Sequence, residues 1–272
     1  MKFLLCLSLS LMALFAEDKG CFVDENSQNI IFVKDGETKS LGLKEKIYKD
    51  QRCAFDESSF YVANLNNEIV KVASEKEFLF ALPNVGCKVS NILLDKEKIY
   101  VACDMANIVT IAIFDKSSKK FISKKFNNVY KISSFLPLSE GVFFTSFNGK
   151  AFLLDSKLNA KEQKSVGFAP VSACKFSDNE IFIGFRNGEI LDLKSGAKKQ
   201  VLRSKISALA CAGDEVLVAG EDGVIYKFDK SLKLKGKKEL FSGEIKEIFI
   251  DKNVLVGVDL GNKTKSLEIN SF

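Results

Sequence analysis

Apolar and polar residues alternate with a period of two along residues 206–229, ISALACAGDEVLVAGEDGVIYKFD. Such alternation is typical of β-strands with one buried face, and turn residues divide the segment into three runs, ISALACA, VLVAG and VIYKF. Asp222-Gly223, between the last two runs, predicts a two-residue hairpin in which both turn residues have positive φ. A single three-stranded meander leaves open edges and an uncovered face, so we expect other segments to repeat it.

Six further segments repeat this layout, and their spacing predicts the fold class. They begin, in chain order, at Cys21, Arg52, Val89, Ile132, Val171 and Ile245. The second residues of the seven turns are Gly36, Asn67, Asn107, Gly149, Gly188, Gly223 and Asn262, which are 31, 40, 42, 39, 35 and 39 residues apart. A repeat of about 40 residues is typical of one blade of a β-propeller. We therefore predict an all-β fold, a seven-bladed β-propeller of four-stranded antiparallel blades whose first and last blades are degenerate.

The fourth strand of each blade is expected in the polar stretches between repeats, for example at residues 120–126 and 199–202. Lysine in these edge strands opposes edge-to-edge aggregation. The first repeat starts at Cys21, and the chain ends at Phe272 after a third strand. Two ring closures are consistent with this pattern: the last blade lacks its outer strand, or the N-terminal stretch supplies it.

The first residues, MKFLLCLSLSLMALFA, have the pattern of a secretory signal peptide. Lys2 provides the positive start, residues 3–15 form a short apolar run, and Ala16 is a small residue at the expected cleavage site. The apolar run is too short for a membrane span, and a retained N-terminal anchor is the alternative. We predict a signal peptide at 1–16 and a single propeller domain at 17–272, exported to a bacterial periplasm without membrane insertion.

The formal net charge of +5 comes almost wholly from lysine, because the chain has only three arginines. The lysines are scattered through the expected turns and strands rather than gathered on one face. Nucleic-acid-binding proteins cluster basic residues with aromatic residues or carry a known motif, and the sequence shows neither pattern. We therefore expect no nucleic-acid partner.

Six cysteines follow the expected signal peptide, and four of them occupy one repeat position near the end of a first strand: Cys21, Cys53, Cys174 and Cys211. Cysteine packs as a small apolar side chain where innermost strands crowd around an axis, so core packing is one interpretation. An even number of cysteines in an oxidising compartment also permits disulfides. Cys21 with Cys53, and Cys174 with Cys211, come from neighbouring repeats, so both interpretations stay open.

The chain contains no histidine, which removes Ser-His-Asp and Cys-His catalytic systems and the commonest metal ligand. It also contains no Cys-x-x-Cys pair and no glycine-rich loop leading into a helix that would bind phosphate. Asp104, Glu221 and Asp222, near the ends of second strands, are the carboxylates that an acid-base or metal site would use, but turn formation is the simpler explanation. We predict no catalytic residue, no metal site and no cofactor.

In a propeller of this type, the loops that enter each first strand share one face with the hairpins between second and third strands. All three arginines fall on that face: Arg52 enters the second repeat, Arg186 lies in the fifth hairpin and Arg203 enters the sixth repeat. Arginine is favoured at protein interfaces because its guanidinium offers a fork of donors and a stacking face. We predict that these residues bind a partner, Arg186 and Arg203 above all; chance placement is the alternative.

The repeats resemble the blades of WD40-like β-propellers from about Cys21 to the C-terminus. The shared features are the strand and turn layout and a closing aspartate, at Asp115, Asp155, Asp192 and Asp229. The Gly-His and Trp-Asp pairs of eukaryotic WD40 blades are absent, since the chain has no histidine and no tryptophan. The hydrogen-bond network of those pairs therefore has no counterpart in this chain. Outer-membrane assembly propellers are similar in repeat style, but they are typically eight-bladed lipoproteins.

An exported, compact, lysine-rich propeller also resembles the accessory L protein (NapL) family of bacterial periplasmic nitrate reductase systems, which is itself WD40-like. That resemblance implies a partner that is a redox enzyme or its electron-transfer subunits, with no cofactor bound by this chain. We predict a monomeric, non-catalytic platform, not an enzyme, that assists assembly, maturation or activity of another periplasmic protein. A scaffold for outer-membrane protein assembly, and a hydrolase or lyase with an axial carboxylate or metal site, are the alternatives.

Overall fold

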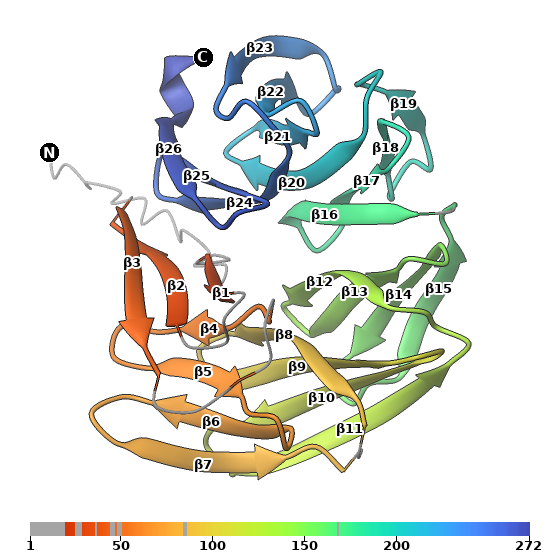
Figure 1. Cartoon of the computed structure of the whole chain (residues 1–272). Coiled ribbons are helices and arrows are strands. Elements are labelled where there is room, and N and C mark those ends of the chain that lie inside the picture. The colour runs from red at the N-terminus through yellow and green to blue at the C-terminus, as the bar shows by residue number, and fades with distance from the viewer. Residues whose placement is uncertain are drawn as a thin grey trace, which may run out of the picture.

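The computed structural model describes residues 20–24, 29–35, 37–43, 47, 51–83, 86–167 and 169–272, so the expected signal peptide at 1–16 lies outside the described residues. Seven antiparallel sheets stand in a ring around a central axis (Figure 1). The fold is therefore an all-β, seven-bladed β-propeller, which confirms the prediction from the repeat spacing. The helical element among the described residues is a short 3-10 helix, η1 (Ile269–Ser271), and no described helix is long and apolar enough to cross a membrane.

Blades 1 and 7 have three strands each, and blades 2 to 6 have four. Blade 1 contains β1 (Cys21–Val23), β2 (Asn29–Lys34) and β3 (Glu37–Gly42); blade 2 contains β4 (Ala54–Phe55), β5 (Phe60–Ala63), β6 (Glu68–Val72) and β7 (Lys76–Ala81). Blade 3 contains β8 (Lys88–Leu94), β9 (Lys98–Met105), β10 (Ile108–Asp115) and β11 (Lys120–Asn127); blade 4 contains β12 (Ile132–Leu138), β13 (Gly141–Ser146), β14 (Lys150–Asp155) and β15 (Ala160–Ser165). Blade 5 contains β16 (Pro170–Ser177), β17 (Glu180–Phe185), β18 (Glu189–Asp192) and β19 (Lys198–Gln200); blade 6 contains β20 (Ile206–Ala212), β21 (Glu215–Gly220), β22 (Val224–Asp229) and β23 (Leu234–Glu239); blade 7 contains β24 (Ile245–Asp251), β25 (Val254–Asp259) and β26 (Thr264–Glu268).

Burial follows the place of a strand within its blade. All six residues of β13 are buried, whereas all six residues of the outer strand β15 are exposed. The second strands of blades 2 to 7 therefore have two buried faces, because a neighbouring blade packs on each side, and the expectation of one buried face was wrong for them. In blade 1, β2 has two buried residues of six. The outer strands expected at 120–126 and 199–202 correspond to β11 and β19, and β19 begins one residue earlier than expected and ends at Gln200.

The hairpin between the second and third strands of blade 6 differs from the expected two-residue turn, whereas blade 3 has the expected one at Ala106-Asn107, since Met105 pairs with Ile108. In blade 6 the N–H of Gly223 donates to the C=O of Gly220 at 3.3 Å, which closes a four-residue turn. Gly223 has positive φ (+79°) and Asp222 does not, so the prediction of two left-handed residues was wrong. A turn followed by one left-handed residue also fits the twist of paired strands, and it needs glycine or asparagine at that single position. The turn residue Gly36 lies outside the described residues.

The ring closes between blades 7 and 1 by side-chain packing. The rings of Phe22 and Phe249 stack with centroids 6.4 Å apart, and Val33, Val256 and Val258 pack around them. At the rim of the same seam, Lys252 Nζ lies 3.0 Å from Asp35 Oδ1. In the described part of the chain, blade 1 contains strands from the N-terminal end and blade 7 contains strands from the C-terminal end. Among the described residues, blade 7 has three strands and no segment from the N-terminal end pairs with it as an outer strand.

The C-terminus packs on blade 6 instead of extending blade 7 (Figure 1). The side chain of Ile269 is buried, and its C=O accepts a hydrogen bond from Lys227 Nζ at 3.2 Å. The Lys227 ammonium also lies 5.5 Å from the centroid of the Phe272 ring. The last residues therefore cover the face between blades 6 and 7, where a fourth strand of blade 7 would otherwise contribute contacts.

Candidate functional site

The antiparallel order within each blade defines two faces of the ring. In blades 2 to 7 the entry face carries the starts of the inner strands and the hairpins between second and third strands, and the exit face carries the other hairpins. Blade 1 runs the opposite way, because Phe22 pairs antiparallel with Arg52, which itself pairs parallel with Asn91 of blade 3. Arg52 precedes β4, Arg186 lies between β17 and β18, and Arg203 precedes β20. The structure therefore places all three arginines on the entry face.

Arg186 and Arg203 lie on two segments of blade 5 that are hydrogen-bonded to each other. The N–H groups of Val201 and Leu202 donate to the C=O of Gly188 at 3.0 and 3.1 Å. Gly188 has φ of +86°, and a Cβ at this position would lie 2.2 Å from the C=O oxygen of Leu202. Only glycine permits this approach of the hairpin to the loop. Both arginine side chains are exposed, and their backbone segments are held next to each other by these hydrogen bonds.

A third cation adjoins this pair. Lys198, on the outer strand β19, holds its ammonium 4.8 Å from the centroid of the Phe185 ring. Lys198, Phe185, Arg186 and Glu189 line a shallow groove at the edge of blade 5. The groove therefore contains two cations, Arg186 and Lys198, and one carboxylate, Glu189.

Arg52 has different surroundings. Its Nε lies 3.4 Å from Glu247 Oε2 of blade 7, and its guanidinium lies 5.7 Å from the centroid of the Phe249 ring. Its N–H donates to the C=O of Ser90 at 2.9 Å, and its C=O accepts from Ile92, also at 2.9 Å. Arg52 thus connects blades 2, 3 and 7 around the axis and is only partly exposed, whereas Arg186 and Arg203 project from blade 5.

The four cysteines at the shared repeat position form two disulfides between neighbouring blades. Cys21 and Cys53 join blades 1 and 2, and Cys174 and Cys211 join blades 5 and 6. Cys21, Cys53 and Cys174 are also buried. Of the two interpretations open for this position, the structure shows the disulfides, in the pairing between neighbouring repeats.

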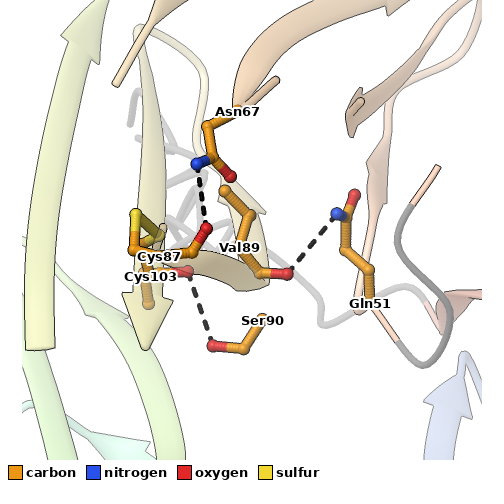
Figure 2. The surroundings of a disulfide bond; sticks show 7 residues. Gln51, Asn67, Cys87, Val89, Ser90 and Cys103 are labelled. Carbon is orange, nitrogen blue, oxygen red and sulfur yellow. Dashed lines mark hydrogen bonds between the residues drawn. A yellow bond between two sulfur atoms is a disulfide. The ribbon is translucent and has the colours of Figure 1, made fainter. Parts of the chain in front are cut away.

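A third disulfide, between Cys87 and Cys103, lies within blade 3 and has no counterpart in the sequence analysis (Figure 2). Cys87 precedes β8 and Cys103 lies in β9, so the bond joins the first two strands of one blade. The side-chain amide of Asn67 donates to the C=O of Cys87 at 2.9 Å and connects it to the hairpin of blade 2. The signal was available, because these two cysteines flank one expected hairpin.

The carboxylates considered for catalysis are not brought together. Asp104 lies in blade 3, where it accepts the N–H of Ile132 at 3.0 Å, and burial raises the pKa of its carboxyl group. Glu221 and Asp222 lie in the hairpin of blade 6, and Asp222 accepts the Tyr226 hydroxyl at 2.6 Å. Within the part of the chain that the structure describes, no group of three or more Cys, Asp or Glu side chains is placed to hold a metal ion.

No protein-family model matches the chain, and no curated protein matches its sequence. Among solved structures, the WD40 β-propeller domain of Doa1 superposes with a TM-score of 0.66 at 12% identity, over 92% of this chain and 93% of that chain. The chain folds as a WD40-like seven-bladed β-propeller. BamB from Moraxella catarrhalis matches this propeller with a TM-score of 0.60 at 12% identity, over 93% of this chain and 92% of that one. The computationally designed Ika8 protein matches with 0.64 at 14% identity, over 89% and 81%. Structural matches at such low sequence identity show the fold alone. They give no support for membership of the nitrate reductase accessory family.

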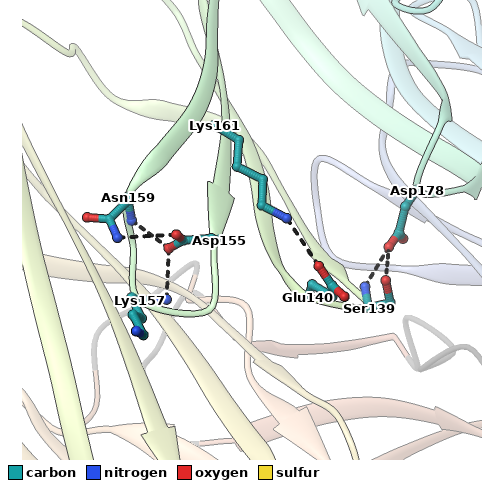
Figure 3. Close-up of polar contacts among 7 residues, drawn as sticks. All are labelled: Ser139, Glu140, Asp155, Lys157, Asn159, Lys161 and Asp178. Carbon is teal, nitrogen blue, oxygen red and sulfur yellow. Dashed lines mark hydrogen bonds and ion pairs between the residues drawn. The ribbon is translucent and has the colours of Figure 1, made fainter.

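In this WD40-like propeller the closing aspartates stabilise the turns into the outer strands. Asp155 Oδ1 accepts the N–H groups of Lys157 and Asn159, each at 2.8 Å, and Oδ2 accepts the Asn159 side-chain amide at 3.2 Å (Figure 3). Asp192 likewise accepts the N–H of Lys194 at 3.0 Å. The aspartate shared with WD40 blades therefore serves a local turn in this chain.

These hydrogen bonds favour the charged carboxylates. Hydrogen bonds lower the pKa of Asp115 to about 2, first from the N–H of Ser118 and then from the hydroxyl groups of Ser117 and Ser118. The Ser231 hydroxyl, 2.6 Å from Asp229 Oδ1, is the main cause that lowers the pKa of Asp229 to about 2. Hydrogen bonds from Asn159 lower the pKa of Asp155 in the same way. A carboxylate whose pKa falls on folding contributes stability above its unfolded pKa and loses that contribution as the pH falls through its folded pKa.

We therefore expect the melting temperature to fall as the pH is lowered from about 4 to about 2. Replacing Asp115, Asp155 and Asp229 together by Asn should lower the melting temperature at neutral pH and make the acid dependence shallower, because these groups no longer titrate. Asp104 has a raised pKa, so its protonation favours the folded protein as the pH falls and partly offsets the loss of stability. Circular dichroism melts across this range measure both effects. An equally steep acid dependence in the triple variant would contradict the assignment.

Proposed function

We propose that this propeller is a non-catalytic platform that binds another exported protein through blade 5 on the entry face. The arginine pair carries the proposal: Arg186 and Arg203 are exposed on hydrogen-bonded segments, and neither forms an ion pair with a described residue. Guanidinium groups bind carboxylates through two parallel hydrogen bonds, and Lys198 adds a third positive charge nearby. We infer that the partner contributes an acidic segment.

The three disulfides support an oxidising, exported environment. Together with the signal-peptide pattern at residues 1–16, they favour the periplasm as the proposed location. Within it, we propose a respiratory redox enzyme as partner, a periplasmic nitrate reductase first, on the basis of the family resemblance. Deleting the gene should then lower the activity of that enzyme and leave other periplasmic enzymes unchanged; unchanged nitrate reductase activity would remove this partner.

The arginine pair can be tested by partner capture. Replacing Arg186 and Arg203 together by Ala should weaken capture of the partner about thirtyfold, because arginine anchors at interfaces commonly contribute more than about 1 kcal/mol each. The measurement uses a photo-crosslinking residue at position 187, followed by isolation of the crosslinked protein from the periplasm. Replacing Lys120 and Lys125 on the exposed strand β11 by Ala removes the same charge elsewhere and should leave capture unchanged. Undiminished capture by a folded Arg186→Ala/Arg203→Ala protein would refute the proposed surface.

A further inference from the structure

Two aromatic side chains lie together on the entry face of blade 4. Tyr130 is in the loop that enters β12, and Phe147 is in the hairpin between β13 and β14. Their rings form an edge-to-face contact with centroids 6.4 Å apart. Tyr130 is 48% exposed and Phe147 is partly exposed, so the pair presents an apolar surface to solvent. Asn148 and Gly149 meet the backbone requirements of the hairpin, so turn chemistry does not explain the ring of Phe147.

Backbone hydrogen bonds hold the hairpin of this aromatic pair beside the hairpin of Arg186. The C=O of Phe147 accepts the N–H of Ala169 at 3.1 Å, and the C=O of Ala169 accepts the N–H of Arg186, also at 3.1 Å. One residue, Ala169, thus connects the hairpins of blades 4 and 5, and it also lines the shallow groove that contains Arg186. The aromatic pair therefore adjoins the surface proposed for the partner.

One repeat position on this face carries a different side chain in each of three neighbouring blades. The N–H groups of Phe147, Arg186 and Glu221 each donate to the C=O of the residue directly before the first strand of their own blade, at 2.9, 3.1 and 3.2 Å. The position therefore offers an aromatic ring on blade 4, a cation on blade 5 and a carboxylate on blade 6. Tyrosine and arginine are enriched among the residues that dominate binding energy at interfaces. Because Glu221 repels an acidic segment, we expect the surface to extend from Arg186 toward blade 4.

The loops around this surface carry an excess of positive charge. The loops entering blades 4 and 6 and the hairpins of blades 4 and 5, at residues 128–131, 201–205, 147–150 and 186–189, contain one carboxylate and five cations: Glu189, Lys131, Lys150, Arg186, Arg203 and Lys205. Two of the cations act on carboxylates elsewhere, since Lys205 forms an ion pair with Glu244 and the charge of Lys131 acts on the carboxyl group of Asp104. Lys150, Arg186 and Arg203 still outnumber Glu189, and this excess favours an acidic segment.

We propose that the partner's acidic segment also carries an aromatic or aliphatic side chain, which packs on Tyr130 and Phe147 while a carboxylate binds Arg186. The two anchors select an acidic segment with an apolar residue over a purely acidic one. Two hydrogen-bond steps of about 4.8 Å each place the hairpins of blades 4 and 5 roughly 10 Å apart, a distance that about three residues of extended chain span. The inference rests on the proposed function, because it takes the arginine pair as the first anchor and adds a second on blade 4.

Two fluorescein-labelled peptides test the second anchor on the folded protein by fluorescence anisotropy. The reference peptide has a central run of glutamates in a serine and glycine background, and the second peptide differs only in a tryptophan three residues before the run and another three residues after it. We expect the tryptophans to tighten binding about tenfold, as is usual for an aromatic anchor at an interface. In Tyr130→Ala this gain should fall below about twofold, whereas Tyr130→Phe should keep it, because the ring makes the contact.

Leu260→Ala is the matched control. Leu260 lies in the entry-face hairpin of blade 7 and is 63% exposed, so its removal also takes an exposed apolar side chain from this face. We expect it to leave the gain from tryptophan unchanged. A gain that is absent, that persists in Tyr130→Ala, or that Leu260→Ala lowers equally would overturn the aromatic anchor.

The peptides also separate this inference from the proposed function. Arg186→Ala/Arg203→Ala should weaken both peptides, whereas Tyr130→Ala should weaken only the one with tryptophan. An acidic peptide that binds through the arginines without a gain from tryptophan would refute the aromatic anchor alone. Failure of both peptides to bind, or binding that Arg186→Ala/Arg203→Ala leaves unchanged, would overturn the arginine surface and this inference with it.

Discussion

Removing the Cys174–Cys211 disulfide should lower the free energy of unfolding by about 4 kcal/mol. The bond joins the inner strands β16 and β20 of neighbouring blades and spans a sequence separation of 37. A crosslink over such a loop restricts the unfolded chain, and the restriction grows with the logarithm of loop length. The effect matters for this ring because the seam between blades 7 and 1 is closed by side-chain packing.

The measurement is urea unfolding of Cys174→Ala/Cys211→Ala under non-reducing conditions, followed by circular dichroism. The matched comparison is Cys87→Ala/Cys103→Ala, whose bond spans a separation of 16 within one blade. The shorter loop predicts a loss smaller by about 0.7 kcal/mol. A Cys174→Ala/Cys211→Ala protein as stable as the parent would show that this disulfide does not stabilise the ring.

Replacing Gly188 by Ala should cost about 3 kcal/mol and also weaken partner capture. The left-handed backbone at this position disfavours a side chain, and the added Cβ would lie 2.2 Å from the C=O oxygen of Leu202, a backbone atom that cannot rotate away. The hairpin must then separate from the loop, which moves Arg186 relative to Arg203. A structural substitution with no charge change thus tests whether the geometry of the pair matters.

Gly196→Ala is the matched control for Gly188→Ala. Gly196 lies in blade 5 and also has positive φ (+73°), but no atom lies within 4 Å of the position of its Cβ. We expect Gly196→Ala to lower the free energy of unfolding by about 1 kcal/mol, which is the cost of placing a side chain on a left-handed backbone, and to leave capture unchanged. The comparison uses urea unfolding for stability and the position-187 crosslink for binding. Equal losses in the two variants would show that the contact with Leu202 carries no energy.

Local patterns were sufficient for the fold. Period-two alternation reports a strand directly, and turn residues such as Asn67, Gly188 and Gly223 report where a left-handed backbone is needed. Both patterns depend only on residues close together in the sequence, so they can be recognised without a tertiary structure. The shared repeat position of Cys174 and Cys211 likewise pointed to a pair of neighbouring blades.

The candidate site was predictable only in part. The common face of Arg186 and Arg203 followed from the repeat register, but their connection through the Gly188 carbonyl depends on how the entry loop folds back on the hairpin. The Cys87–Cys103 bond was not predicted, because both cysteines lie within blade 3 and away from the repeat position that the other four cysteines share. An axial cavity of about 320 Å³ has no local signal, since its wall is assembled from the inner strands of six blades.

The sequence by itself determined the number of blades and the order of strands within them, because these follow from alternation, turn chemistry and repeat length. The direction of blade 1, and with it the face of its turns, was decided by the tertiary structure, in which Phe22 pairs antiparallel with Arg52. The tertiary structure alone decided which distant side chains meet. Arg52 of blade 2 reaches Glu247 of blade 7 only once the ring has closed, and no local pattern records that approach. The shape of the axial cavity has the same origin, since seven similar blades leave a space only after they close around an axis.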